Sequence, residues 1–168
     1  MPEGGSPWAL AELRLNCRNT REIAAFVRQF GGGVPASASP EGDPIKFIEA
    51  SSEESLLNSV LAEIRQLIEI KNEKPENIVV IAGSRKERDM FHAVHSPLFS
   101  FSSWDLRAES AIGCETPMRA KGIEADHVIF ATLNEGIQNN EMYVGASRAR
   151  TNLVIVGPKS FKERFSIA

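Results

Sequence analysis

Cysteine is scarce in this sequence of 168 residues, which contains only Cys17 and Cys114. Small secreted domains that cannot build a sufficient core rely on several disulfide bonds, and two cysteines do not make such a framework. Long hydrophobic runs are also missing, because no apolar segment reaches the length that crosses a bilayer. The sequence therefore indicates a reduced, cytoplasmic setting and no membrane partner.

The N-terminal residues lack the apolar core of a signal peptide, since they read Met1-Pro2-Glu3-Gly4-Gly5-Ser6-Pro7. We expect residues 1–12 to be a linker or the start of an expressed fragment. Residues 13–168 are expected to form a single domain, because a chain of this length supports one adequate core. The content of 42% hydrophobic and 24% charged residues is ordinary for a globular domain.

An excess of positive charge is absent as well. The 19 lysines and arginines are outnumbered by 22 aspartates and glutamates, so the formal net charge is −3. No global positive field therefore indicates a nucleic-acid partner. Any contact with nucleic acid has to come from a local patch of the surface.

A phosphate-binding loop of the form Gly-x-x-x-x-Gly-Lys-Ser/Thr is missing from the whole sequence. The glycine run Gly31-Gly32-Gly33 is followed by Val34-Pro35, with no Lys-Ser/Thr and no helix start, so it indicates a linker. No acidic pair at a strand end supplies a magnesium site. The chain therefore lacks the usual means of holding a nucleotide triphosphate and its metal by itself.

Two clusters of side chains each have a functional and a simpler interpretation. His92 and His95, with Cys114 and His127 near them, superficially suggest a metal site. A zinc site needs four well-spaced ligands, or three with a water, so we expect His92 and His95 to be solvated surface residues and the set to hold no metal. Aromatic residues also gather at Phe99, Phe101 and Trp104. Trp104 is suited to stacking on a nucleobase, but a place in the core or at a buried edge is the more frequent use of such a residue.

Strand and helix patterns alternate along the chain. Strands are expected at residues 11–15, 45–48, 78–82, 111–114, 126–133 and 152–156, with one short edge strand within 97–107. Helices are expected after residues 19, 51 and 84, over 139–150, and over 158–165. This alternation favours an α/β fold with a mainly parallel sheet and helices on both faces. The runs at 78–82, 128–131 and 153–156 are expected to be neighbouring buried strands.

Three helix starts have capping signals. Asn19 is followed three residues later by Glu22, and Ser51 by Glu54, which is the spacing of a reciprocal cap. Ser84 is expected to cap the charged helix that follows it.

The most informative segment is Tyr143-Val144-Gly145-Ala146-Ser147-Arg148-Ala149-Arg150, which lies between a helical pattern and a strand. Arginine is always charged, and its planar fork matches phosphate oxygens. An arginine held at the end of an α/β element is therefore a candidate for stabilising a phosphoryl group during transfer.

This segment resembles the sixth motif of UvrD/Rep-like superfamily 1 DNA helicases, Tyr-Val-Ala-x-Thr-Arg-Ala. The segment Thr116-Pro117-Met118-Arg119-Ala120-Lys121-Gly122-Ile123-Glu124 is similar to the fifth motif of that family, Thr-x-His-x-x-Lys-Gly-Leu-Glu, and a strand follows it. The segment Leu15-Asn16-Cys17-Arg18-Asn19-Thr20 is similar to the fourth motif, Leu-x-x-Asn-Tyr-Arg-Ser. The three segments occur in the order of the family, and the resemblance extends from about Leu13 to Val156.

The resemblance implies that the chain is the C-terminal, second RecA-like domain of such a helicase. Its ligands would be ATP with Mg²⁺, held mainly by the N-terminal RecA-like domain of the same full-length protein, and single-stranded DNA. Arg18 and Arg148 would contact the γ-phosphate, with Arg148 as the arginine finger. Glu124 would bond the nucleotide ribose. The remaining residues implied are Lys121 and Gly122 in the nucleotide-binding turn, and Thr116, Met118 and Arg119 along the DNA.

The chain departs from the family pattern in several ways. Met118 stands where the family has histidine, and Ser147 replaces threonine but keeps the hydroxyl. Only residues 83–115 separate the strand at 78–82 from Thr116, which is too short for the large helical subdomain inserted in the best-known relatives. Arg150 has no role by resemblance and reads as a charge at a helix end.

Two other functions are consistent with the sequence. One is a degenerate, non-catalytic helicase-like module that acts in protein assembly, for instance beside a nuclease. The other is an unrelated α/β nucleotide-binding domain, against which the three matched segments argue. The isolated chain is expected to lack ATPase activity in any of these cases, because the phosphate loop and metal site are missing.

Overall fold

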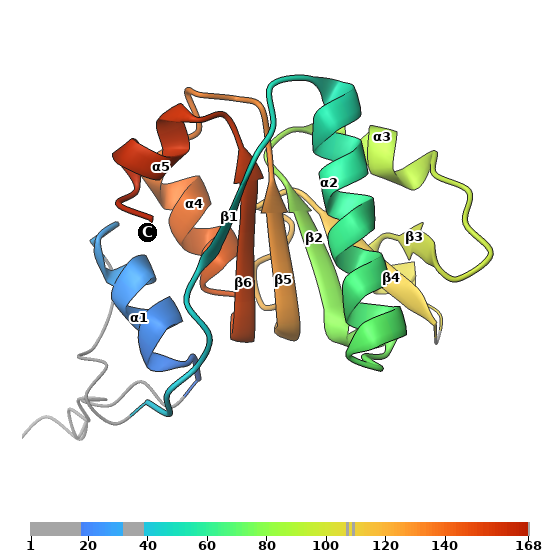
Figure 1. Cartoon of the computed structure of the whole chain (residues 1–168), viewed down its shortest axis with the longest axis horizontal. Coiled ribbons are helices and arrows are strands. Elements are labelled where there is room, and N and C mark those ends of the chain that lie inside the picture. Colours follow the sequence, from blue (N-terminus) through green and yellow to red (C-terminus); the bar gives the residue numbers. More distant parts are fainter. Residues whose placement is uncertain (1–17, 32–38, 107, 109, 168) are drawn as a thin grey trace, which may run out of the picture.

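Six parallel strands form one sheet in the computed structural model, which describes residues 18–31, 39–106, 108 and 110–167. The strands are ordered β1-β6-β5-β2-β4-β3 across the sheet (Figure 1). Their bounds are β1 Lys46–Glu49, β2 Ile78–Ala82, β3 Ser100–Ser102, β4 Ala111–Glu115, β5 Ala125–Ala131 and β6 Ala149–Gly157. The expected α/β fold with a parallel sheet is therefore confirmed, while the strand expected at 11–15 lies outside the described residues.

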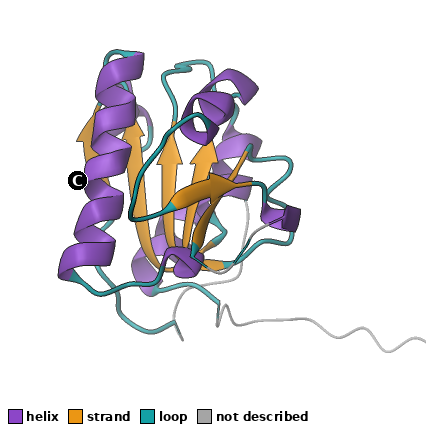
Figure 2. Cartoon of the chain, turned by 90° about the vertical axis from the view of Figure 1, so that its right-hand side faces the viewer, coloured by secondary structure: helices purple, strands orange, loops and turns teal. Residues whose placement is uncertain are grey.

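Helices cover both faces of this sheet, as the right-handed crossovers between parallel strands require. The helices are α1 Arg21–Arg28, α2 Glu53–Arg65, α3 Arg85–His92, α4 Asn139–Ala146 and α5 Ser160–Arg164. Three short helical turns complete the set: η2 Gln66–Ile70, η3 Pro75–Asn77 and η4 Trp104–Leu106. Residues of α2 and α3 pack on one face, where α2 stands along the side of the strands in Figure 2, and residues of α1, α4 and α5 pack on the other.

The central strands are buried on both faces. Every residue of β2 and β4 is buried, which agrees with their nearly continuous apolar sequences. The strands β2, β5 and β6 are neighbours, in the register Val79 to Val128 and Val128 to Leu153. This arrangement confirms the prediction for these three runs. The outer strand β1 is only half-buried, as expected at an edge of the sheet.

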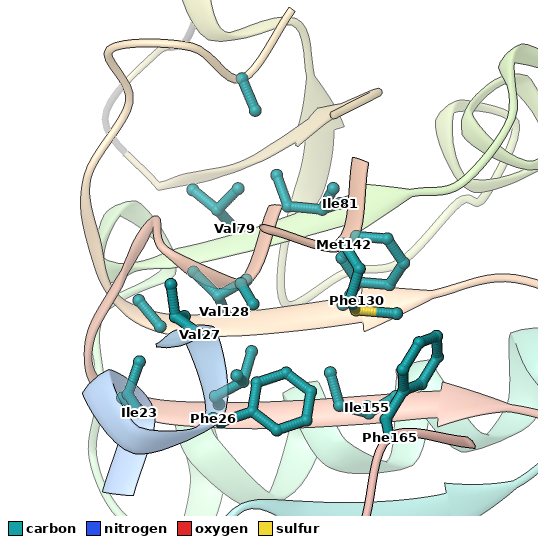
Figure 3. Packing of buried hydrophobic residues seen from close by; sticks show 14 of the residues in the cluster. Ile23, Phe26, Val27, Val79, Ile81, Val128, Phe130, Met142, Ile155 and Phe165 are labelled. Carbon is teal, nitrogen blue, oxygen red and sulfur yellow. The ribbon is translucent and has the colours of Figure 1, made fainter. Parts of the chain in front are cut away.

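Alternate residues of each central strand contribute to two separate cores. One core holds Ile23 and Phe26 of α1, Met142 of α4 and Phe165 beyond α5, together with inward residues of β2, β5 and β6 such as Phe130 (Figure 3). Each of these large side chains is at most 7% exposed. Fully burying a side chain of this size contributes about 1.5–3 kcal/mol, so this core fixes α1 and α4 on the same face of the sheet.

The helix expected over 139–150 is shorter than predicted, because α4 ends at Ala146 and β6 already begins at Ala149. Ala149 lies opposite Ala125 in the pairing of β5 with β6, so the sheet takes over the backbone at this point. Arg150 is therefore a strand residue, and the expectation that it lies at a helix end is wrong. Its guanidinium lies 3.5 Å from an oxygen of Asp126.

The capping predictions were correct for one helix. The Ser84 hydroxyl caps α3 by accepting a hydrogen bond from the Glu87 backbone N–H at 3.2 Å. Helix α2 is capped by Ser52 with Ser55, not by Ser51 with Glu54. The pattern alone cannot distinguish two adjacent serines, since either has the correct side chain. No helix in the described part of the chain is long and apolar enough to cross a membrane.

Candidate functional site

Arg148 occupies the short connection between α4 and β6, and its guanidinium is held by hydrogen bonds. Its Nε donates to the Val144 carbonyl at 2.9 Å, and Nη1 donates to the Ile123 carbonyl at 3.4 Å. Nη2 donates to the Ser147 hydroxyl at 2.8 Å, and this hydroxyl in turn donates to the Val144 carbonyl at 3.1 Å. The Ser147 hydroxyl therefore helps to fix the guanidinium, and each terminal nitrogen keeps a second N–H for a ligand.

The electrostatic setting of Arg148 is unusual for an arginine. Burial, and then the positive charge of Arg18, lower the pKa of Arg148, while Tyr143 opposes this shift. Arginine begins from so high a pKa that it stays charged at neutral pH. Two like charges brought this close form a local positive site on a chain of net negative charge. An anion placed between them would relieve their repulsion.

Arg18 forms an ion pair with Glu124, which lies directly before β5. Their side chains are 40% and 44% exposed, so the pair lies at the rim of the site. The structure thus brings together Arg18, Arg148 and Glu124, the residues that the sequence predicts at the nucleotide. All three lie at the amino ends of β5 and β6 or beside them.

Asn19 explains how Arg18 reaches this place. The Asn19 side-chain amide donates to the carbonyl oxygens of Ser147, at 3.3 Å, and of Ala149. The next backbone N–H, of Thr20, donates to the Arg150 carbonyl at 3.1 Å. The prediction that Asn19 caps α1 with Glu22 is wrong, because Thr20 is the N-cap residue and the Glu22 carboxylate accepts from the Gly42 backbone N–H at 2.7 Å. Asn19 is only 4% exposed. Burial of this polar side chain indicates its structural role, and the sequence alone does not reveal that burial.

Lys121 and Gly122 form the exposed turn that leads to Glu124. Gly122 has a φ of +85°, a left-handed conformation that glycine adopts without strain. A Cβ atom at this glycine would meet nothing within 4 Å, so the conformation and not close packing requires it there. The turn leaves its backbone accessible to a ligand beside the arginines.

Thr116, Met118 and Arg119 lie at the opposite end of the sheet from the arginine site. Thr116 follows the last residue of β4, level with the carboxyl ends of β2 and β5. Strand geometry places this edge about 20 Å from the amino end of β5. The Thr116 carbonyl accepts the backbone N–H groups of Arg119 and Ala120 at 3.0 Å each, which defines the turn. The residues predicted to bind DNA therefore share a surface that is separate from the predicted nucleotide site.

The remaining candidates have structural roles. Among the described residues, no group of three or more His, Cys, Asp or Glu side chains is arranged to hold a metal ion. His127 is buried on β5 and lies 3.2 Å from Glu73. His92 is hydrogen-bonded to the Cys114 carbonyl at 3.1 Å. Trp104 packs against the core on the α1 side of the sheet, which agrees with the simpler interpretation of this aromatic residue.

Comparison with known proteins bears on the fold. No family model matches the sequence, and no curated protein matches it. Among solved structures, the chain is similar to the C-terminal domain of a possible DNA helicase from Lactobacillus plantarum WCFS1. The TM-score is 0.64 at 17% sequence identity, over 84% of this chain and 87% of the other. The six parallel strands with helices on both faces are therefore those of a RecA-like α/β domain, and at this identity the likeness concerns the fold alone.

Proposed function

We propose that this chain is the C-terminal motor domain of an ATP-dependent DNA helicase of the UvrD/Rep-like superfamily 1 type. One observation carries the proposal. Segments that lie more than a hundred residues apart bring Arg18, Glu124 and Arg148 to one end of β5 and β6. The fold shared with a helicase C-terminal domain supports the same conclusion.

The chemistry of these residues suits a polyphosphate. Arg148 is fixed by its backbone partners and is half-buried, so it meets a developing negative charge without reorganising. Arg18 is partly exposed and pairs with a carboxylate, a partner that a phosphate oxygen would replace when the two domains close. Glu124 then becomes available to accept a hydrogen bond from a ribose hydroxyl, as the resemblance implies.

The rest of the reaction belongs to another domain in this proposal. The sequence has no phosphate loop, and the described residues contain no cluster suited to a metal. ATP and its Mg²⁺ would therefore be held mainly by an N-terminal RecA-like domain of a longer protein. Closure of the two domains would bring Arg18 and Arg148 to the γ-phosphate, which makes hydrolysis depend on closure. The single-stranded DNA would cross the surface at Thr116.

A specific observation favours the rival function, a non-catalytic helicase-like module in protein assembly. Arg18 forms an ion pair with Glu124, and every nitrogen of the Arg148 guanidinium has a partner within the chain. These internal contacts satisfy both arginines with groups of the chain itself, as a structural role requires. The two functions differ in whether Arg148 affects the rate of ATP hydrolysis.

The test uses the protein that joins this domain to a phosphate-loop domain. Arg148→Ala is expected to leave nucleotide affinity within a few-fold, whereas DNA-stimulated ATP hydrolysis falls by about 10³–10⁵. Arg148→Lys is expected to rescue poorly, since an ammonium group does not reproduce the planar fork. Arg150→Ala is the matched control, because this neighbouring arginine pairs with Asp126 at the surface. Equal turnover in all of these proteins would favour the assembly module.

A further inference from the structure

Glu115 is a buried carboxylate at the carboxyl end of β4, and neither the resemblance nor the composition assigns it a role. Its side chain is 2% exposed. One carboxylate oxygen accepts from the Trp104 backbone N–H at 3.1 Å, and the other accepts from Arg119 Nε at 2.8 Å. Burying a carboxylate is costly unless it is paired and hydrogen-bonded. The two bonds therefore fasten η4 and the turn after β4 to the same carboxylate.

The Arg119 guanidinium is bound at one side only. Its side chain is 54% exposed although Nε is engaged, which leaves the terminal N–H donors of the fork at the surface. A second acidic group near the guanidinium, among the residues that the structure describes, is Asp105, whose Oδ2 lies 3.8 Å from Arg119 Nη2. This distance is too long for a hydrogen bond, and Asp105 is itself 80% exposed. Asp105 is therefore close enough to attract the Arg119 guanidinium but does not form a hydrogen bond with it.

The surroundings of the fork suit a nucleic-acid strand better than a free anion. Met118 is 52% exposed beside Arg119, and Leu106 is 82% exposed beside Asp105. Large apolar side chains at the surface offer contacts for sugars and bases, and the fork offers contacts for phosphate. A single-stranded phosphodiester chain presents both kinds of group at once.

We propose that Glu115 is a positioning residue that orients Arg119 toward a phosphate of single-stranded DNA, and that Asp105 competes with this phosphate. The inference rests on the proposed function for the identity of the strand. Glu115 acts through Arg119, since its buried side chain does not reach a ligand at the surface. Glu115 ends β4 and Arg119 lies four residues later in the following turn, so the carboxylate holds the guanidinium at its Nε side.

The sign of the effect separates this role from general electrostatics. Glu115→Gln removes a negative charge, so electrostatics alone would strengthen binding to DNA. The amide nitrogen of glutamine cannot accept a hydrogen bond, so one of the two bonds to Trp104 and Arg119 is lost. Positioning therefore predicts weaker binding. Fluorescence anisotropy measures the binding of a labelled oligothymidylate to the whole chain over a range of salt concentrations. The direction of the change in affinity distinguishes positioning from general electrostatics.

The expected results form a double-mutant cycle. Arg119→Ala weakens binding about tenfold and lowers the salt slope by about 0.7, whereas Arg65→Ala, an exposed arginine on α2, changes the affinity less than twofold. Glu115→Gln weakens binding about fivefold in the wild type and has no further effect in Arg119→Ala. An equal loss in both backgrounds, or tighter binding by Glu115→Gln, would overturn the proposal.

Asp105→Ala provides a variant that does not disturb the buried carboxylate. It is expected to tighten binding about threefold, while Asp43→Ala, an exposed aspartate near the opposite edge of the sheet, gives only the small effect of the changed net charge. Equal effects of the two aspartate variants would overturn the competing role. If the wild-type chain does not bind the oligonucleotide at low salt, this inference fails, whereas the hydrolysis measurements on Arg148 still test the motor independently.

Discussion

The side chain of Asn19 donates hydrogen bonds to the backbone carbonyls on either side of Arg148. This contact fastens the segment that carries Arg18 to the connection between α4 and β6. It also joins residues that are 128 and 130 positions apart in the sequence. The two arginines are therefore brought to one place by the Asn19 amide and the Thr20 backbone N–H, together with the ion pair of Arg18 with Glu124.

Replacing Asn19 is expected to loosen this junction. Asn19→Ala leaves buried carbonyl groups without a donor, so the free energy of unfolding should fall by about 1–3 kcal/mol. Asn58→Ala is the matched control, because Asn58 is exposed in the middle of α2. Urea denaturation of both variants measures the difference. A loss of stability no larger than that of the control would contradict the structural role of Asn19.

Gly145 is expected to reverse the usual effect of alanine in a helix. Alanine normally stabilises a helix by about 1 kcal/mol relative to glycine. At this position of α4, however, a Cβ atom would overlap the ring of Phe130 and crowd Ile81. Gly145→Ala should therefore lower the melting temperature, at a cost of about 1–3 kcal/mol from overpacking. Asn140→Ala in the same helix is exposed and should be neutral or stabilising, and a higher melting temperature for Gly145→Ala would disprove the close packing.

The isolated chain is expected to bind ATP weakly and to hydrolyse none. It has no phosphate loop, and arginines that act on charge developing in the transition state contribute little to binding in the ground state. The measurement is phosphate release by the purified chain with Mg²⁺ and single-stranded DNA, with Arg148→Ala as the control for contaminating activity. ATP turnover that disappears in Arg148→Ala would show a complete catalytic site in this chain, and it would refute the proposal that another domain holds ATP and Mg²⁺.

Cys114 is expected to make stability depend on alkaline pH. Burial, and then the negative charge of Glu115, raise the pKa of the Cys114 thiol far above its ordinary value of 9.0. The folded state thus keeps a proton that the unfolded state loses above pH 9, so this contribution is fully present below pH 9 and declines above it. The slope is up to about 1.4 kcal/mol per pH unit. Urea unfolding at about pH 8 and pH 10 should show a smaller decline for Cys114→Ala than for the wild type, and equal declines would contradict the shift.

The central strands were predictable because burial on both faces demands continuous apolar runs, which few other elements require. Ile78–Ala82 is such a run, and the structure gives it the expected neighbours. The convergence of Arg18 and Arg148 was also expected, although only from the resemblance. By contrast, the predicted end of α4 was wrong. The residues up to Arg150 suit a helix locally, but pairing of Ala149 with β5 makes Ala149 and Arg150 part of β6.

The polar contacts of the site could not be predicted from the sequence. Asn19 followed by Glu22 has the spacing of a cap, yet both side chains serve distant parts of the chain instead. Glu115 and Arg119 are four residues apart, but Glu115 ends a strand and Arg119 lies in the following turn, so the helical rule for this spacing does not apply. Polar and charged side chains such as these have several possible partners that differ little in free energy. Which partner they bind depends on the tertiary structure.

Residues 116–124 connect the two candidate surfaces of the domain. The stretch begins at the carboxyl end of β4, beside the pair of Glu115 and Arg119, and finishes at Glu124 before β5. Ala120 and Ile123 anchor it in the core between these points. In the proposed function, a change at the nucleotide has to displace the single-stranded DNA. One covalent segment therefore joins the two surfaces, exposed at Met118, Arg119 and Lys121 but held in the core at Ala120 and Ile123, so a shift of Glu124 would reach Thr116 along the backbone itself.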